Sequence, residues 1–166
     1  MPEAEGPCRF GMYNKFQKIV LDSMPEFSSV RIGALSTKDG YSLEGLVDSS
    51  RIGILRRAAY LSVIVADVMD RLLWRVRPYE REKGAADHLI ETSTTTMANS
   101  FERHAGEGKF SPILDDFDDV LKKGAALVDP DIPRKPRIGV VGEIYLRTHV
   151  LANQDTIRNL ERFGAE

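Results

Sequence analysis

The sequence predicts an α/β fold that is predominantly helical, with a central helical bundle flanked by two partial βα pieces. Apolar residues recur at helical spacing over most of the 166 residues, while two short apolar runs are typical of strands, and prolines and glycines separate these stretches. The prediction divides the chain into residues 1–48 (helix, then strand), 49–130 (a helical region) and 131–166 (strand, loop and helix).

The first piece begins with an amphipathic helix. Apolar residues recur at helical spacing after Gly6-Pro7, which predicts a helix from Cys8 to Ser23, and Pro25 ends it. From Val30 to Leu35 apolar residues alternate with small or polar ones, which predicts a short strand.

Three helices are expected in the central region. A long apolar helix runs from Arg51 until Pro78 stops or kinks it. A second is expected over residues 80–104, although three consecutive threonines lower its propensity. Ser111 and Pro112 predict the N-cap and first turn of a third helix. Its expected buried stripe is Ile113, Leu114, Phe117, Val120 and Leu121.

The last piece reads as strand, loop and helix. Residues 138–142 form a short apolar run of the kind buried in parallel sheets, Asn153 is a good N-cap, and Gly164 suits a left-handed C-terminal cap. Such a unit calls for a second parallel strand beside the first, and the opening helix has no strand before it. We therefore expect both ends to be cut from a larger protein.

Composition narrows the classes of function. Charged residues make up 29% of the chain and nearly cancel to a net charge of -2, which disfavours general binding to nucleic acid or to an anionic membrane. The most apolar run falls well short of the about 20 residues that span a bilayer. Because no signal peptide opens the chain, we expect a cytoplasmic protein.

Cys8, the one cysteine, is the candidate metal ligand. The sequence Gly6-Pro7-Cys8-Arg9 places a thiol at a helix N-terminus beside a guanidinium, and both the helix dipole and Arg9 favour the thiolate. A small buried hydrophobic residue is the alternative interpretation, since free cysteine often packs in this way. Any other ligands of a metal bound here come from elsewhere.

Gly142, Glu143, Tyr145 and Arg147 are the candidate cofactor-binding residues. They follow a predicted parallel strand at its carboxyl end, where open α/β sheets place their ligands. Glu143 could orient a ligand hydroxyl, take part in acid–base chemistry, or simply pair with Arg147. The glycine-rich phosphate-binding fingerprint is missing.

Two charge clusters have simpler interpretations. The acidic group Asp115, Asp116, Asp118 and Asp119 lies early in a predicted helix, where it complements the dipole on a solvated face. The basic group Arg75, Arg77, Arg81 and Lys83 is interpreted as a solvated helix end rather than as a docking or anion site.

Two stretches carry a family resemblance. These are GPCRFGMYNKFQKIVLD (Gly6 to Asp22) and Lys135 through Arg147, the latter followed by Ala152-Asn153. Together with Arg77-Pro78-Tyr79-Glu80 between them, they resemble large bacterial proteins related to the CoA-substrate-specific enzyme activases and to the 2-hydroxyacyl-CoA dehydratase subunits. The resemblance covers nearly the whole chain, and many members of this family are uncharacterised proteins.

The resemblance implies a fold, a cofactor and a function. The flanking pieces would belong to flavodoxin-like (Rossmann-like) layers of the parent protein, and Cys8 would be one thiolate of a 4Fe-4S cluster whose other ligands lie outside this chain. Low-potential electron transfer or activation of a CoA-thioester enzyme would be the parent's task, as an ATP-dependent activase or a dehydratase-like protein. The partners would be an ASKHA-type ATPase region or a dehydratase, with a CoA thioester as ligand.

For the isolated chain the resemblance implies no cofactor and no activity, and a homodimer could cover its cut edges. Two alternatives to the iron-sulfur fragment stay open. One is a non-catalytic interaction module whose helices dock an ATPase region or partner enzyme, and the other is a small-molecule or nucleotide binder that uses the loop after Val140-Val141.

Overall fold

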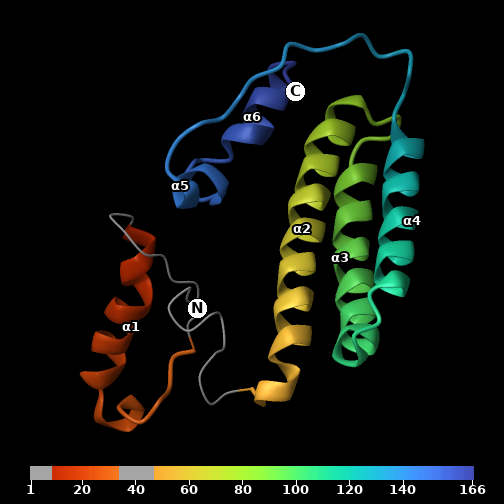
Figure 1. Ribbon diagram of the computed structural model, residues 1–166. Helices are drawn as coiled ribbons and strands as arrows, with labels where there is room; N and C mark the ends of the chain where they lie inside the picture. The colour runs from red at the N-terminus through yellow and green to blue at the C-terminus, as the bar shows by residue number, and fades with distance from the viewer. Residues whose placement is uncertain (1–8, 34–46) are drawn as a thin grey trace. The chain divides into compact units, whose positions relative to one another are not determined.

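The chain forms two compact units, Met1–Ala59 and Tyr60–Glu166. The computed structural model describes residues 9–33 and 47–166, and Figure 1 shows their helices. The predicted predominance of helix is confirmed, because the described residues form six α-helices and five short 3-10 helices. No helix in these ranges combines the length and the apolar character needed to cross a membrane.

The first unit contains one amphipathic helix. A 3-10 turn, η1 (Arg9–Met12), leads into α1 (Tyr13–Asp22), and η2 (Pro25–Phe27) follows. The predicted helix is thus confirmed over residues 9–22. No residue of α1 is buried, and its apolar side chains include Phe16 at 66% and Ile19 at 68% exposed. The unit's described part resumes at residue 47, and η3 (Ser49–Arg51) leads into α2 (Ile52–Val76).

Three helices form the core of the second unit. These are α2, whose first residues belong to the first unit, α3 (Ala85–His104) and α4 (Ser111–Leu127), which lie side by side in Figure 1. Their buried apolar side chains recur at helical spacing and face the neighbouring helices. The set comprises Val65, Met69, Val76, Ala86, Met97, Ile113, Phe117 and Val120.

Helix α3 presents small and polar residues to its neighbours. Ser93 and Ser100 are both buried, and the hydroxyl of Ser100 donates to the Asp116 carboxylate of α4 at 2.6 Å. The hydroxyls of Thr94 and Thr96 donate to the carbonyls four residues earlier. Because these hydroxyls bond within the helix, the threonine run does not interrupt it.

Helix α3 begins later than residue 80, where the sequence predicted its start. Gly84 has a positive φ of 91°, which favours glycine, and the Glu80 carboxylate accepts hydrogen bonds from the backbone N–H groups of Gly84 and Ala86, both at 2.8 Å. Glu80 also forms an antiparallel bridge with Val128. It therefore caps α3 from outside instead of beginning it.

The predicted strands are not found in the described residues. Residues 30–33 and 138–141 have no regular structure, and residues 34 and 35 lie outside the described ranges. The flavodoxin-like βα pieces are therefore not supported by the described backbone. Within residues 138–141, the backbone hydrogen bonds among the described residues are limited to one, from the N–H of Ile138 to Glu166 at 2.8 Å. A strand needs a repeated row of such bonds to a neighbour, and one bond does not make one.

Two short helices complete the second unit, α5 (Ile144–Thr148) and α6 (Thr156–Arg162). Gly164 has φ 89° after α6, as predicted for a left-handed cap. Asn153 and Ser111 were predicted as N-caps, but neither residue occupies the N-cap position of its helix. Ser111 is the first residue of α4 itself, and Asp155 occupies the N-cap position of α6.

Candidate functional site

The predicted metal ligand, Cys8, lies outside the described residues, which begin at Arg9. Within the described ranges, no group of three or more histidine, cysteine, aspartate or glutamate side chains could hold a metal ion. An iron-sulfur cluster needs about four protein ligands, and the chain has one cysteine. The donor set of this chain alone therefore does not fit a 4Fe-4S cluster, and further thiolates would have to come from outside it.

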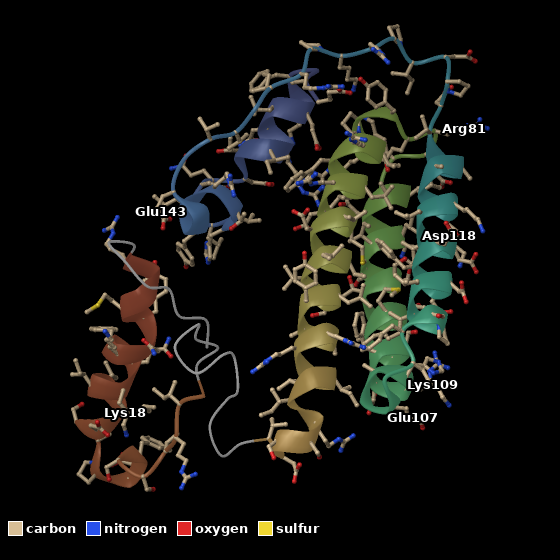
Figure 2. The ribbon with its side chains drawn as sticks, viewed as in Figure 1. Lys18, Arg81, Glu107, Lys109, Asp118 and Glu143 are labelled. Atoms are coloured by element: carbon tan, nitrogen blue, oxygen red, sulfur yellow. The ribbon has the colours of Figure 1, made fainter. Side chains whose placement is uncertain are left out.

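The predicted cofactor-binding residues, Gly142 to Arg147, form a glycine turn followed by a capped helix, and we call this stretch the cofactor loop. Gly142 has φ 150°, a conformation that residues with a side chain rarely adopt, and it directly precedes Glu143, after which α5 begins. Glu143 is the N-cap of α5, and its carboxylate accepts a hydrogen bond from the backbone N–H of Leu146 at 2.9 Å. Figure 2 shows Glu143 at the start of this helix. A carboxylate here also complements the helix dipole.

Hydrogen bonds from two side chains, Asn153 and His149, link the end of α5 to the start of α6. The side-chain amide of Asn153 donates to the carbonyl of Arg147 at 2.9 Å, and its oxygen accepts from the N–H of Thr156 at 3.3 Å. Nδ1 of His149 accepts from the N–H of Ala152 at 3.1 Å. Asn153 thus joins α5 to the first turn of α6, which is a more specific role than the predicted N-cap.

The four predicted cofactor residues are neighbours in the sequence, and all four are exposed in the structure. The ring of Tyr145 lies 4.7 Å from the ring of His149, and Tyr145 is 52% exposed. Arg147 is also exposed. The ion pair between Glu143 and Arg147, one of the open alternatives, does not form within the described residues, because Glu143 caps the helix instead.

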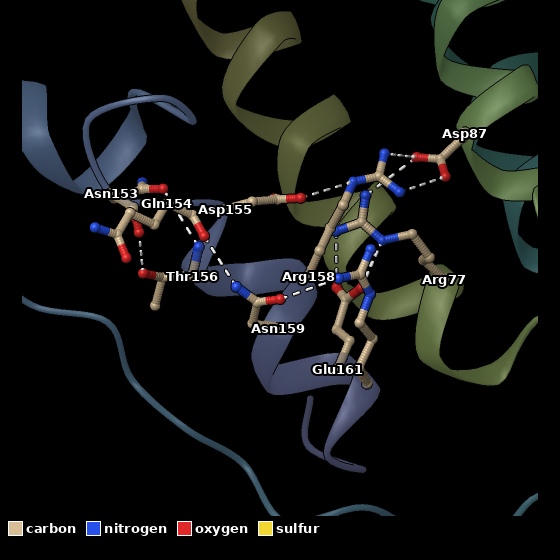
Figure 3. A network of polar contacts seen from close by, with 10 residues as sticks. Arg77, Asp87, Asn153, Gln154, Asp155, Thr156, Arg158, Asn159 and Glu161 are labelled. Carbon is tan, nitrogen blue, oxygen red and sulfur yellow. Dashed lines mark hydrogen bonds and ion pairs between the residues drawn. The ribbon is translucent and has the colours of Figure 1, made fainter.

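An ionic cluster beside this loop was missed from the sequence. Nε and Nη2 of Arg77 donate to Glu161 of α6 at 2.6 and 2.8 Å, and Nη1 donates to Asp87 of α3 at 3.1 Å. Asp87 also accepts two hydrogen bonds from Arg158, at 2.8 and 3.0 Å (Figure 3). We call Arg77, Asp87, Arg158 and Glu161 the α6 cluster.

The interpretation of the basic stretch as a solvated helix end was wrong for Arg77. Its side chain is only 10% exposed, and that of Glu161 is 12% exposed. Burial alone would lower the pKa of Arg77, but the hydrogen bonds and charges of Glu161 and Asp87 outweigh it, so the pKa is raised. The guanidinium is therefore permanently charged and is held by two carboxylates, with the geometry of a structural clamp.

No local sequence signal could have found this cluster. Arg77 and Asp87 are 10 positions apart, but Arg158 lies 71 positions from Asp87 and Glu161 lies 84 positions from Arg77. No pattern in the sequence links residues that far apart.

A second contact holds the C-terminal residues. The hydroxyl of Tyr79 donates to the Glu166 carboxylate at 2.5 Å and accepts from the N–H of Lys135 at 2.9 Å. Arg137 donates to the same carboxylate at 2.9 Å. The pKa of Glu166 is lowered by the hydrogen bonds from Tyr79 and Arg137, so the carboxylate is ionised at neutral pH.

The acidic cluster of α4 behaves mostly as predicted. Asp118 forms an exposed ion pair with Lys122 at 2.6 Å, and Figure 2 shows Asp118 on the outside of the helix. Asp116 is the exception, because it accepts the hydrogen bond of the buried Ser100. This group is therefore a solvated face with one buried contact.

Comparisons with protein-family models, with curated proteins and with solved structures give no match. The family resemblance based on the two motifs stays a prediction. The structure adds the geometry of the cofactor loop and of the α6 cluster, which the sequence does not show.

Proposed function

We propose that this chain is part of an iron-sulfur protein related to the activators and subunits of 2-hydroxyacyl-CoA dehydratases. Its role would be in low-potential electron transfer or in the activation of a CoA-thioester enzyme. The observation that carries the proposal is the pair of motifs, Gly6 to Gly11 and Val141 to Arg147, in one chain. The proposal keeps the flavodoxin-like βα arrangement for the flanking pieces.

The loop geometry supports the second motif as a ligand-binding position. Glu143 caps α5 directly after Gly142, and the exposed side chains of Tyr145 and Arg147 have no ion pair among the described residues. An aromatic ring and a guanidinium are suited to a phosphorylated, ring-containing ligand such as the nucleotide part of a CoA thioester. Gly142, Glu143, Tyr145 and Arg147 remain the proposed contacts.

In this proposal Cys8 supplies one thiolate of the cluster. In the sequence Cys8 directly precedes Arg9, and a neighbouring positive charge favours the thiolate that iron requires. When bound, the cluster supplies one-electron chemistry at low potential. The proposed contribution of this chain is to hold one ligand and the neighbouring charge.

The test is anaerobic reconstitution of the protein that carries this chain, with iron, sulfide and the visible spectrum as readouts. Cys8→Ser should lower the iron and sulfide content and change the visible spectrum, because one ligand is lost. Met12→Leu is the matched control, since it alters a sulfur side chain four positions away. Equal cluster content in Cys8→Ser and wild type would contradict the proposal.

A specific observation favours the alternative, a non-catalytic module that docks an ATPase region or partner enzyme. The apolar side of α1 carries five side chains that are 38% to 68% exposed, and such surfaces mark interaction sites in many proteins. They are Met12, Tyr13, Phe16, Ile19 and Val20. A protein that takes up no iron in the reconstitution would leave this alternative as the better account.

A further inference from the structure

Residues 136–166 close on themselves through hydrogen bonds, and we call this segment the strap. Its two ends are joined, because the N–H of Glu166 donates to the carbonyl of Pro136 at 2.9 Å and the N–H of Ile138 donates to the carbonyl of Glu166 at 2.8 Å. Between the ends, the Asn153 side chain joins α5 to the first turn of α6. The strap is therefore one body, and it includes the cofactor loop.

The strap contributes little to the apolar core of the bundle, which is formed by α2, α3 and α4. Among the described residues, ten apolar side chains are buried, and nine of them lie between Val65 and Val120. Ala165 is the tenth, and no residue of α6 is buried. Because a segment with few buried apolar contacts opens more readily than a core helix, we expect the strap to open more readily than the bundle.

Charged side chains join the strap to the bundle. Glu161 of the strap accepts two hydrogen bonds from Arg77, directly after α2, at 2.6 and 2.8 Å (Figure 3). Arg158 of the strap donates two hydrogen bonds to Asp87 of α3, at 2.8 and 3.0 Å. Such bonds are directional and strong while they are made, but each group can bond to water instead once the two sides separate. The α6 cluster can therefore break without disturbing the apolar core.

A stiff tether, residues 128–135, connects α4 to the strap. It forms no helix, and Pro130 and Pro133 fix their own φ angles, so that it behaves as a semi-rigid spacer. Tyr79 holds the tether near both of its ends. The carbonyl of Tyr79 accepts from the N–H of Asp129 at 2.7 Å, and its hydroxyl accepts from the N–H of Lys135 at 2.9 Å. A strap on such a tether stays near its docking position, and closing it again costs little entropy.

We propose that the strap opens from the bundle as one body when the α6 cluster breaks, while α2, α3 and α4 stay folded. Opening uncovers Arg77 and Asp87, whose side chains are 3.1 Å apart in the closed state. It also carries the cofactor loop away with α6, because Asn153 joins the two short helices. The α6 cluster is thus a switch for the position of the cofactor loop, and the proposal does not depend on an iron-sulfur function.

Native-state hydrogen exchange, measured by NMR at single backbone amides, tests the proposal. Phe163 and Ala165 report on the strap, since their N–H groups bond to carbonyls within it. Met97 and Val120 report on the bundle, since they lie inside α3 and α4. In the wild-type chain we expect the strap amides to exchange at least roughly tenfold faster than the bundle amides.

Two variants separate the strap from the bundle. Ile113→Val shortens a side chain that is 0% exposed in the core, so it should speed exchange of the bundle amides roughly fivefold and leave the strap amides unchanged. Arg77→Gln removes the cation that Glu161 and Asp87 share, so it should speed exchange of the strap amides roughly tenfold. Lys122→Gln, which removes an exposed ion pair, is the matched control and should leave the strap amides unchanged.

Other results overturn the proposal. If Ile113→Val sped the strap amides as much as the bundle amides, the strap would open only when the whole unit unfolds. If Arg77→Gln left the strap amides unchanged, the α6 cluster would not hold the strap. If Phe163 and Ala165 responded differently from each other, the strap would not move as one body.

Discussion

Asp87 shows how single side chains decide the position of α6. It accepts hydrogen bonds from both guanidinium groups of the α6 cluster, while Arg77 also bonds to Glu161 in a bidentate manner. Removing one partner from such a cluster is costly, because the remaining charges stay partly buried. The exposed ion pairs, such as that between Glu107 and Lys109, contribute little by comparison.

Among single residues, Asp87 makes the stability of the fold depend on pH. Burial would raise its pKa, but hydrogen bonds from Arg158 and Arg77 outweigh it, and the pKa is lowered. Its contribution is therefore fully present above the unfolded value of about 3.9 and is lost as the pH falls through the lower folded value. We expect Asp87→Asn to be less stable than wild type at pH 7, with a shallower loss of unfolding free energy below pH of about 4.

Urea denaturation at a series of pH values, followed by the fluorescence of Trp74, measures this difference. Asp118→Asn is the matched control, because its carboxylate is 59% exposed and pairs only with lysine. If Asp87→Asn and Asp118→Asn gave the same dependence on pH, the α6 cluster would not hold Asp87 as described.

At the scale of elements, α2 and α4 approach closely at a glycine. A Cβ atom on Gly124 would lie 2.8 Å from Cδ2 and 2.9 Å from Cδ1 of Leu72. Gly124 is buried, so a side chain here cannot turn to solvent. The glycine thus sets how closely these two helices pack.

Gly124→Val should destabilise the second unit by about 1–3 kcal/mol, because the added methyl groups push against Leu72. Gly124→Ala should cost less, because the ends of the Leu72 side chain can move and alanine favours the helix. Thermal and urea denaturation measure both. Lys123→Val, one position away and exposed, carries the same branched side chain, and an equal loss of stability there would rule out the steric explanation.

The elements also show what the sequence could predict. Helical spacing and Pro78 predicted α2 correctly in type and end, but they did not single out its buried face, on which Val65 and Met69 are buried while the neighbouring Ile64 is 40% exposed. A helix that is apolar on several sides has more than one candidate buried face, and its partners choose among them. Leu114, predicted as buried in α4, is 49% exposed for the same reason.

The loop was predicted in part. A glycine and a carboxylate before a helix are local signals, so the turn at Gly142 and the position of Glu143 beside a helix start could be expected. The use of that carboxylate as a cap and the links made by Asn153 depend on the exact backbone path. The α6 cluster could not be predicted, since Arg158 and Glu161 bond to residues that lie 71 and 84 positions away in the chain.

For the whole molecule, the buried apolar core lies in one part of the chain. Every described apolar residue of this core falls between Val65 and Ala165, whereas α1 has no buried residue. Because burial of apolar surface is the main stabilising contribution, the second unit carries most of the stability.

We therefore expect a chain limited to residues 49–166 to keep a single cooperative thermal transition, with a midpoint within about 5 °C of that of the whole chain. Circular dichroism on heating measures it. The starting point at 49 retains η3 and all of α2, so no helix is cut. A broad transition without cooperativity would show that the first unit contributes to the fold.

The α6 cluster also bears on the order in which the protein is made. The contact between Ser100 and Asp116 spans 16 positions, whereas the bonds of Glu161 to Arg77 span 84. During synthesis from the N-terminus, α2, α3 and α4 can therefore pair while α6 is still inside the ribosome. Until α6 emerges, Arg77 and Asp87 have each other but lack Glu161 and Arg158, so the nascent chain holds an incomplete charge site that α6 closes.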